Sequence, residues 1–274
     1  MEIYQGVLLG ILQGITEFLP VSSSGHLVLG QHFLKMTEPM LTFDISVHLG
    51  TLAAIVIVFF KDIKKISSSI FRPLSPNSKP DIRLLLLILT GCIPTAFLGC
   101  IIKIWEDVIF SSILLVGSML ILTGIFLWQT KKWQTRKQVA QDRETKISNF
   151  TFKSALFIGV CQGIAVIPGI SRSGATISAA LFAGLDRKTA AKFSFLLSIP
   201  AVIGAELLQL AASMDQPIIL TQATIWGTVS SFITGYIALV LLLKLVNKGK
   251  LYLFAPYCWT LGAAIIIYYL TSLF

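Results

Sequence analysis

Two short stretches of the chain carry polar side chains whose types and spacing suit phosphate chemistry. The first, Gly10–His26, reads GILQGITEFLPVSSSGH, and the second, Gly159–Thr176, reads GVCQGIAVIPGISRSGAT. Each begins as an apolar helix, breaks near a proline and offers hydroxyl groups where a new helix should start. The free backbone N–H groups and the dipole at a helix start favour anions. Both breaks are therefore candidate phosphate sites.

Arg172, in the second break, is the candidate anion ligand. A guanidinium fork matches phosphate oxygens with paired hydrogen bonds, and a lone cation at membrane depth is costly. The alternative is a structural arginine bound to helix carbonyl groups. The donors expected to share the anion are Ser22, Ser23, Ser24 and Gly25 in the first break and Ser171, Ser173, Gly174 and Thr176 in the second.

Glu17 and His26 add groups that can react. Gln13 and Glu17 are four residues apart and so share a helix face. A carboxylate beside a phosphate calls for a divalent cation between them, Mg²⁺ or Ca²⁺, with Glu17 as the protein ligand. His26 can be a nucleophile, a general acid or a general base near neutral pH; the alternative is a hydrogen-bonded structural histidine.

Four more polar residues lie in or beside apolar stretches. Asp44 and His48 are again four residues apart, and they are either partners of the site or a polar contact between helices. Glu206 has no partner that the sequence identifies. His32 is expected at the membrane interface.

The composition is that of a membrane protein. Of 274 residues, 55% are hydrophobic and 13% charged, against about 25% charged in soluble domains, and the mean hydropathy is +0.81. The length suits about six to eight membrane spans of ~20 residues in one domain, residues 1–274. The net charge of +9 is explained by cytoplasmic loops, so the lipid bilayer, and no nucleic acid, is the expected partner.

The apolar runs predict an all-α polytopic fold with six transmembrane helices and two re-entrant helical hairpins. Each hairpin consists of two helices too short to cross the hydrocarbon core, and an irregular break at this depth needs protein or a wet cavity around it. The predicted spans are Phe43–Phe60, Leu84–Ile102 with a bend near Pro94, Ser112–Trp128, Thr189–Ala212, Leu220–Leu243 and Tyr252–Ser272. The predicted hairpin helices are residues 6–19 and 26–34, then Ser154–Ile167 and Ala175–Gly184. Lys61–Arg83 and Lys131–Lys153 are predicted loops.

The two polar stretches are related by an internal duplication. At a fixed offset of 149 residues, seven of eighteen ungapped positions are identical, among them Gly10/Gly159 and Gln13/Gln162. We therefore expect a first repeat over residues 1–130, a cytoplasmic loop over 131–153 and a second repeat over 154–274.

The basic residues predict how these repeats lie in the membrane. Placing the two long loops inside puts 19 of the 22 Lys and Arg residues on the cytoplasmic side, as the positive-inside rule requires. Three spans separate the hairpins, so the first enters from outside and the second from the cytoplasm. Such an inverted-topology repeat brings broken helices together near the midplane.

The two motifs, residues 13–26 and 168–176, resemble the paired signatures of the undecaprenyl-diphosphatase family, the bacitracin-resistance type. The resemblance extends over the whole chain in length and span order. It implies removal of the terminal phosphate from undecaprenyl diphosphate, which recycles the lipid carrier for cell-wall polymers and confers bacitracin resistance. It also implies a divalent cation and an active site facing outside in the bacterial plasma membrane. The residues that match the family's essential groups are Glu17, His26 and Arg172, and those that match its phosphate-site hydroxyls are Ser23, Ser171, Ser173 and Thr176.

Gln13 occupies the first acidic position of the family's E/Q-xxx-E motif, a permitted form with one carboxylate fewer. Another membrane phosphatase class also uses SGH and SR elements, but the further His–Asp element expected downstream is missing here.

The predicted activity is therefore hydrolysis of a polyprenyl diphosphate lipid, with Ser23 (His26 as base) or His26 itself as the nucleophile. The alternative is a lipid-phosphate flippase, because inverted repeats with broken helices suit alternating access. A homodimer is a further expectation.

Overall fold

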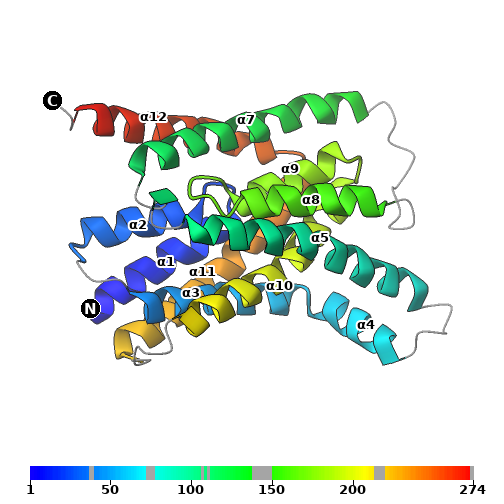
Figure 1. Cartoon of the computed structure of the whole chain (residues 1–274), viewed down its shortest axis with the longest axis horizontal. Coiled ribbons are helices and arrows are strands. Elements are labelled where there is room, and N and C mark those ends of the chain that lie inside the picture. The colour runs from blue at the N-terminus through cyan, green and yellow to red at the C-terminus, as the bar shows by residue number, and fades with distance from the viewer. Residues whose placement is uncertain are drawn as a thin grey trace.

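The computed structural model describes residues 1–36, 40–71, 78–105, 108–109, 112–137, 150–212 and 220–271, with the side chains of 133–137 and 212 left aside. Within these ranges the secondary structure is entirely helical. The long helices run side by side along one direction (Figure 1), which we take as the membrane normal.

Among the described residues, six helical segments are long and apolar enough to cross a membrane, which confirms the predicted number of spans. Five of them are single helices, and the last begins with the 3₁₀ turn Leu251–Phe254. Their bounds are α3 Leu41–Val58, α5 Lys79–Ile104, α7 Ile113–Lys137, α10 Arg187–Ala212, α11 Gln222–Asn247 and α12 Ala255–Thr271. Pro94 lies inside α5 as expected, and Pro200 lies inside α10.

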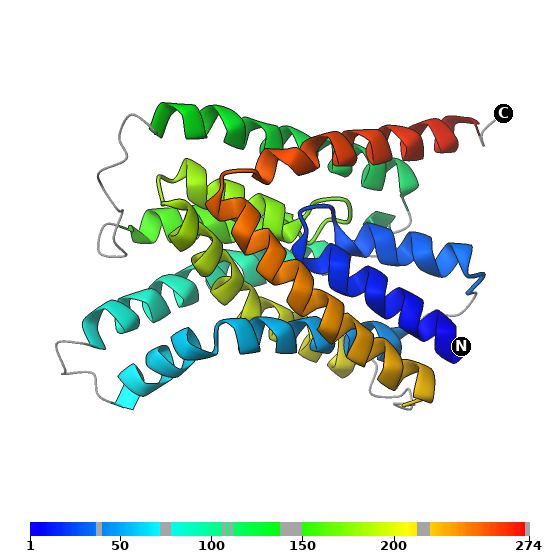
Figure 2. The same cartoon turned by 180° about the vertical axis from the view of Figure 1, so that it is seen from behind.

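The two hairpins are also confirmed. The first consists of α1 (Ile3–Phe18) and α2 (Ser23–Phe33), and the second of α8 (Phe152–Ile164) and α9 (Arg172–Phe182). They enter from opposite ends of the molecule, and their breaks meet near its middle (Figures 1 and 2). The first enters from the end at which both chain termini lie. This is the arrangement that an inverted-topology repeat requires.

The packing partners exchange between the two halves in the way that an inverted repeat predicts. Helix α1 packs along α11, whereas its counterpart α8 packs along α5. In the same way α3 lies against α11 and α10 against α5, while α7 and α12 pack on each other. Each hairpin is therefore held by a long helix of the other half. The exact repeat boundaries, 1–130 and 154–274, stay predictions.

Glycines at matching positions of the duplication allow these crossings. A Cβ atom added to Gly10 would lie 2.1 Å from the carbonyl oxygen of Gly227 on α11, and one added to Gly159 would lie 2.1 Å from that of Gly91 on α5. Small residues at membrane helix crossings let the backbones approach this closely. The identity of Gly10 and Gly159 in the sequence therefore reflects a shared packing requirement.

Both loops, Lys61–Arg83 and Lys131–Lys153, were predicted too long, because helices extend into them from each side. Phe60–Phe71 forms a helix, α4, because Ile63 and Ile66 are spaced to pack on the core while the lysines between them stay in water. Helix α5 begins at Lys79, α7 continues to Lys137 and α8 begins at Phe152. Residues 72–77 and 138–149 of the two predicted loops, and Ser272 of the last predicted span, lie outside the described residues.

We expect Gly10→Val to destabilise the protein by about 1–3 kcal/mol, the usual cost of overpacking, because the new side chain would meet the backbone of α11. The matched control is Gly99→Ala on α5, since Gly99 has open space within 4 Å of an added Cβ. Alanine has the higher helix propensity, so this control should stabilise by up to about 1 kcal/mol. Thermal unfolding in detergent measures both changes, and equal shifts for the two variants would contradict the close crossing.

Candidate active site

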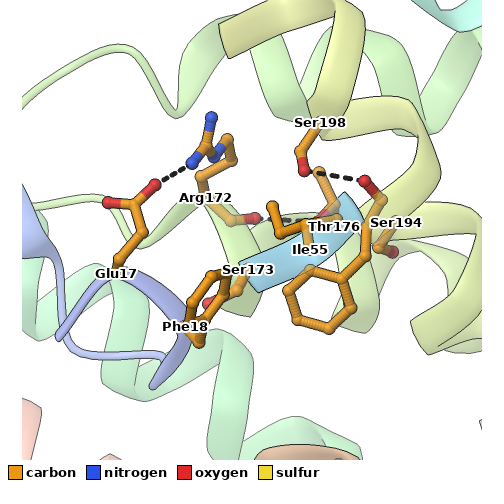
Figure 3. A pocket seen from close by; sticks show the side chains of 9 residues that line it. Glu17, Phe18, Ile55, Arg172, Ser173, Thr176, Ser194 and Ser198 are labelled. Atoms are coloured by element: carbon orange, nitrogen blue, oxygen red, sulfur yellow. Dashed lines mark hydrogen bonds and ion pairs between the residues drawn. The ribbon is translucent and has the colours of Figure 1, made fainter. Parts of the chain in front are cut away.

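An ion pair between the two hairpins forms the centre of the site. Glu17 lies in the last turn of α1, and Arg172 is the first residue of α9. The guanidinium Nη2 of Arg172 donates to Oε1 of Glu17, and the two side chains point toward one another across the gap between their helices (Figure 3). The Glu17 side chain is only 4% exposed and that of Arg172 is 26% exposed. The duplication thus joins an acid from one break to a cation from the other.

The second oxygen of Glu17 is held by the first hairpin itself. Oε2 accepts a hydrogen bond of 2.6 Å from the Ser23 hydroxyl and one of 2.9 Å from Nε2 of Gln13. With Arg172, three donors surround one carboxylate, which keeps it oriented and compensates for its burial. Ser23 is therefore directly paired with Glu17.

Local turn chemistry places Arg172 at the start of α9. Gly169 adopts a positive φ of +96°, which glycine tolerates, and Ser171 caps α9 by accepting from the Gly174 N–H at 3.1 Å. Thr123 on α7 braces this break, because its hydroxyl donates to the Gly169 carbonyl at 3.0 Å and accepts from the Ser171 N–H at 3.2 Å.

The first break is strained and is tied to the second. Ser22 has φ +69°, an uncommon backbone conformation for a residue with a side chain. Its hydroxyl accepts a hydrogen bond of 3.1 Å from the Gly169 N–H, so a hydrogen bond links the two breaks in addition to the ion pair. Helix α12 supports this side, where the Cys258 thiol donates to the Pro20 carbonyl at 3.3 Å.

The two ring nitrogens of His26 contact the Ser22 carbonyl and the Tyr257 hydroxyl and not the Ser23 hydroxyl. Its Nδ1 lies 2.8 Å from the Ser22 carbonyl oxygen, which can only accept, so Nδ1 carries the proton. Its Nε2 lies 2.6 Å from the Tyr257 hydroxyl, and the two rings stack with an angle of 14° between their planes. The sequence does not reveal Tyr257, because 231 residues separate it from His26.

Of the pair Asp44 and His48, only His48 lies beside Glu17. His48 on α3 lies with its Nε2 4.0 Å from Oε2 of Glu17 and its Nδ1 3.7 Å from Oε1 of Glu206 on α10. Asp44 itself accepts a 2.7 Å hydrogen bond from Gln31 of α2. The partner that the sequence did not identify for Glu206 is therefore His48.

A cavity of about 380 Å³ opens in front of the ion pair. The polar side chains around the ion pair form one cluster, and most other lining residues are apolar or small residues of α5 and α10. Its lining includes Glu17, Ser23, Ser24, His48, Ser171, Arg172 and Glu206 at the polar end, and Ala96, Gly99, Val202 and Leu208 farther along. The shape suits a molecule with a charged head and an apolar body.

The other predicted residues lie around or behind this cavity. Ser173 and Thr176 line a second, small cavity of about 10 Å³ behind Arg172 (Figure 3), and Thr176 donates to the Arg172 carbonyl at 2.8 Å. Gln13 and Ser22 are buried among their partners. Gly25 and Gly174 lie in the first turns of α2 and α9, where an added Cβ on Gly174 would meet Pro20 at 3.1 Å.

The sequence matches the family described as bacitracin resistance protein BacA over residues 6–264. The chain belongs to the BacA family. Three similar relatives, each named undecaprenyl-diphosphatase, come from Desulforapulum autotrophicum (54% identical), Desulfosudis oleivorans (50%) and Desulfatibacillum aliphaticivorans (45%). The matches cover 95–97% of this chain and 96–98% of the relatives.

The donor groups of this BacA member fit a cation that is shared with a phosphate. Among the described residues, no three His, Cys, Asp or Glu side chains converge to hold a metal by themselves. Glu17 nevertheless offers a carboxylate at the polar end of the cavity, next to the Ser23 hydroxyl. Mg²⁺ is commonly bound through one or two carboxylates together with substrate phosphates, and this half-site suits that mode.

We expect Arg172→Met alone to cost about 3–5 kcal/mol of stability, because it leaves the Glu17 carboxylate buried without its ion-pair partner. The double variant Glu17→Gln/Arg172→Met should recover most of this loss, since no buried charge is then left unpaired. Thermal unfolding of the wild type, Arg172→Met, Glu17→Gln and the double variant in detergent forms a double-mutant cycle, which measures the coupling free energy between the two residues.

The matched control for this cycle is Lys192→Met. Lys192 pairs with Asp62 where both side chains are more than a quarter exposed, so its loss should cost at most about 1 kcal/mol. Additive effects of Glu17→Gln and Arg172→Met would contradict a direct pair.

Proposed function

We propose that this protein hydrolyses undecaprenyl diphosphate to undecaprenyl phosphate and inorganic phosphate. The observation that carries the proposal is the Glu17–Arg172 ion pair, with Ser23 on the same carboxylate, at the polar end of a largely apolar cavity. Family membership and relatives named undecaprenyl-diphosphatase support the same substrate. The activity recycles the carrier lipid of cell-wall synthesis and accounts for bacitracin resistance.

Arg172 exchanges partners when the substrate binds. A diphosphate entering the cavity competes with Glu17 for the guanidinium, which binds phosphate oxygens through two parallel hydrogen bonds. The N–H groups at the start of α9 add positive potential. Preorganised donors of this kind stabilise the charge that develops in phosphoryl transfer.

Ser23 is the proposed nucleophile and Glu17 its base. The Ser23 hydroxyl already donates to Glu17 at 2.6 Å, and Glu17 becomes a better proton acceptor once Arg172 has moved to the phosphate. The Ser23 oxygen attacks the terminal phosphorus, its proton passes to Glu17, and undecaprenyl phosphate leaves. Water then hydrolyses the phosphoserine and releases phosphate. A divalent cation held by Glu17, as Mg²⁺ or Ca²⁺, supplies further positive charge to the phosphate oxygens when bound.

The site is proposed to face the outer side of the bacterial plasma membrane. Most of the apolar lining of the cavity comes from the C-terminal parts of α5 and α10, which run toward the end of the molecule where both termini lie (Figure 1). Helix α4 ends and α5 begins at the opposite end, where α7 also ends and α8 begins (Figure 1). The predicted cytoplasmic loops between these helices hold most Lys and Arg residues. The isoprenoid tail lies along the apolar part of the cavity and the lipid boundary. A homodimer stays a prediction.

We expect the purified protein in detergent to release phosphate from undecaprenyl diphosphate, and to lose this activity with a chelator and regain it with Mg²⁺ or Ca²⁺. A detergent micelle has no second side, so a flippase would show no product there. Phosphate measured over time, with undecaprenyl phosphate as the control substrate, distinguishes the two functions. A chain that moves the lipid in vesicles but releases no phosphate in micelles would contradict the proposal.

We expect Ser23→Ala to lower kcat at least a hundredfold and to abolish an acid-stable phosphoenzyme, because phosphoserine survives acid whereas phosphohistidine does not. His26→Gln should be slower but should still form the acid-stable adduct. Trapping with substrate labelled at its terminal phosphate measures both variants. Ser118→Ala is the control, since that hydroxyl donates to the Leu114 carbonyl within α7. An acid-labile adduct that vanishes in His26→Gln would assign the nucleophile to His26 instead.

A further inference from the structure

His48 occupies a position in the site that the proposed chemistry has not yet used. It projects from α3 into the cavity, its side chain is 27% exposed, and it lies between the carboxylates of Glu17 and Glu206. Glu17 comes from the first hairpin and Glu206 from α10, so two elements place a carboxylate beside the imidazole that α3 supplies.

The hydrogen bond of His48 determines which ring nitrogen carries its proton. Nδ1 lies 2.8 Å from the backbone carbonyl oxygen of Asp44, one helical turn earlier. A carbonyl oxygen only accepts, so Nδ1 is the donor, and the neutral imidazole presents its Nε2 lone pair on the opposite side. Nε2 is also the ring nitrogen that lies nearer to the carboxylate of Glu17.

The separation of the two groups suits a shared metal ion. Nε2 of His48 and Oε2 of Glu17 are 4.0 Å apart, too far for a hydrogen bond. Two ligands that each lie about 2.1 Å from one ion can be separated by up to about 4.2 Å. Histidines that bind metals almost always donate their other ring N–H to a carbonyl or a carboxylate, and His48 already does so.

Glu206 supplies the negative charge behind the imidazole. Its Oε1 lies 3.7 Å from Nδ1 of His48, while its Oε2 is buried and has no hydrogen-bond partner among the described residues. The residue is 93% buried and lines the same cavity. A buried carboxylate facing a cavity that receives a diphosphate is repulsive unless a cation enters as well.

We propose that His48 joins Glu17 as the second protein ligand of the divalent cation, with Glu206 positioning the imidazole. This inference rests on the proposed function, because phosphate oxygens and water complete a coordination sphere to which the protein contributes only two ligands. An imidazole ligand favours transition metals over Mg²⁺ and Ca²⁺. The protein should therefore bind Mn²⁺ more tightly than either of those two ions.

The test uses Mn²⁺ as the probe, with the full-length protein in detergent and methylenediphosphonate as a diphosphate that cannot be hydrolysed. Electron spin echo spectroscopy detects a directly bound imidazole through the modulation caused by its ¹⁴N nucleus. We expect this modulation in the wild type and in His26→Gln, and its loss in His48→Gln together with at least tenfold weaker Mn²⁺ binding.

Glu206→Gln distinguishes positioning from ligation. It should keep the ¹⁴N modulation and bind Mn²⁺ up to about tenfold more weakly, because the variant removes a negative charge 3.7 Å from Nδ1 of His48. His32→Gln, on an exposed side chain at the end of α2, is the matched control and should change neither measurement. Thermal unfolding of each variant shows that it is folded.

Three results would overturn the proposal. The first is ¹⁴N modulation that persists in His48→Gln, and the second is a wild type that binds Mn²⁺ without this modulation. The third is a wild type that binds no Mn²⁺. Phosphate release from undecaprenyl diphosphate is measured on the same preparations. Hydrolysis without a bound imidazole contradicts the metal site alone, whereas an imidazole-bound Mn²⁺ without hydrolysis contradicts the proposed function alone.

Discussion

The structure depends on one charge pair placed where the bilayer would least tolerate a single charge. Glu17 and Arg172 lie 155 residues apart in sequence, at helix ends that border the breaks of two hairpins entering from opposite ends. Either charge alone in this low-dielectric region would be strongly unfavourable. The two breaks therefore stabilise each other, and the hydrogen bond from Gly169 to Ser22 fixes their relative position. The pair exists because the fold brings both hairpin tips to the same depth.

The duplication repeats the backbone but divides the chemistry between its copies. Helix α7 braces the second break through Thr123, and its partner α12 braces the first through Cys258 and Tyr257. Gly10 and Gly159 allow the same close helix crossing in each half. The reacting groups differ: the first break holds the acid, and the second holds the cation. An inverted repeat joins the two at one point without any symmetric pairing of like charges.

The cavity explains why such a site suits an amphipathic lipid. Its polar end holds Glu17, Arg172 and Ser23, while α5 and α10 continue it with mostly apolar side chains. A diphosphate head is drawn to the fixed donors, which act strongly because little water surrounds them. The tail meanwhile stays in surroundings like those of the membrane. Head and tail are thereby recognised by different physical forces in one continuous space.

The sequence by itself determined the spans, both hairpins and the candidate pair Glu17 and Arg172, because apolar runs, local breaks and an internal repeat are written along the chain. It did not predict α4, whose helix depends on packing two isoleucines against the core. Nor did it connect His48 with Glu206 or His26 with Tyr257. These contacts join residues 158 and 231 positions apart, and only tertiary packing decides which helix faces meet.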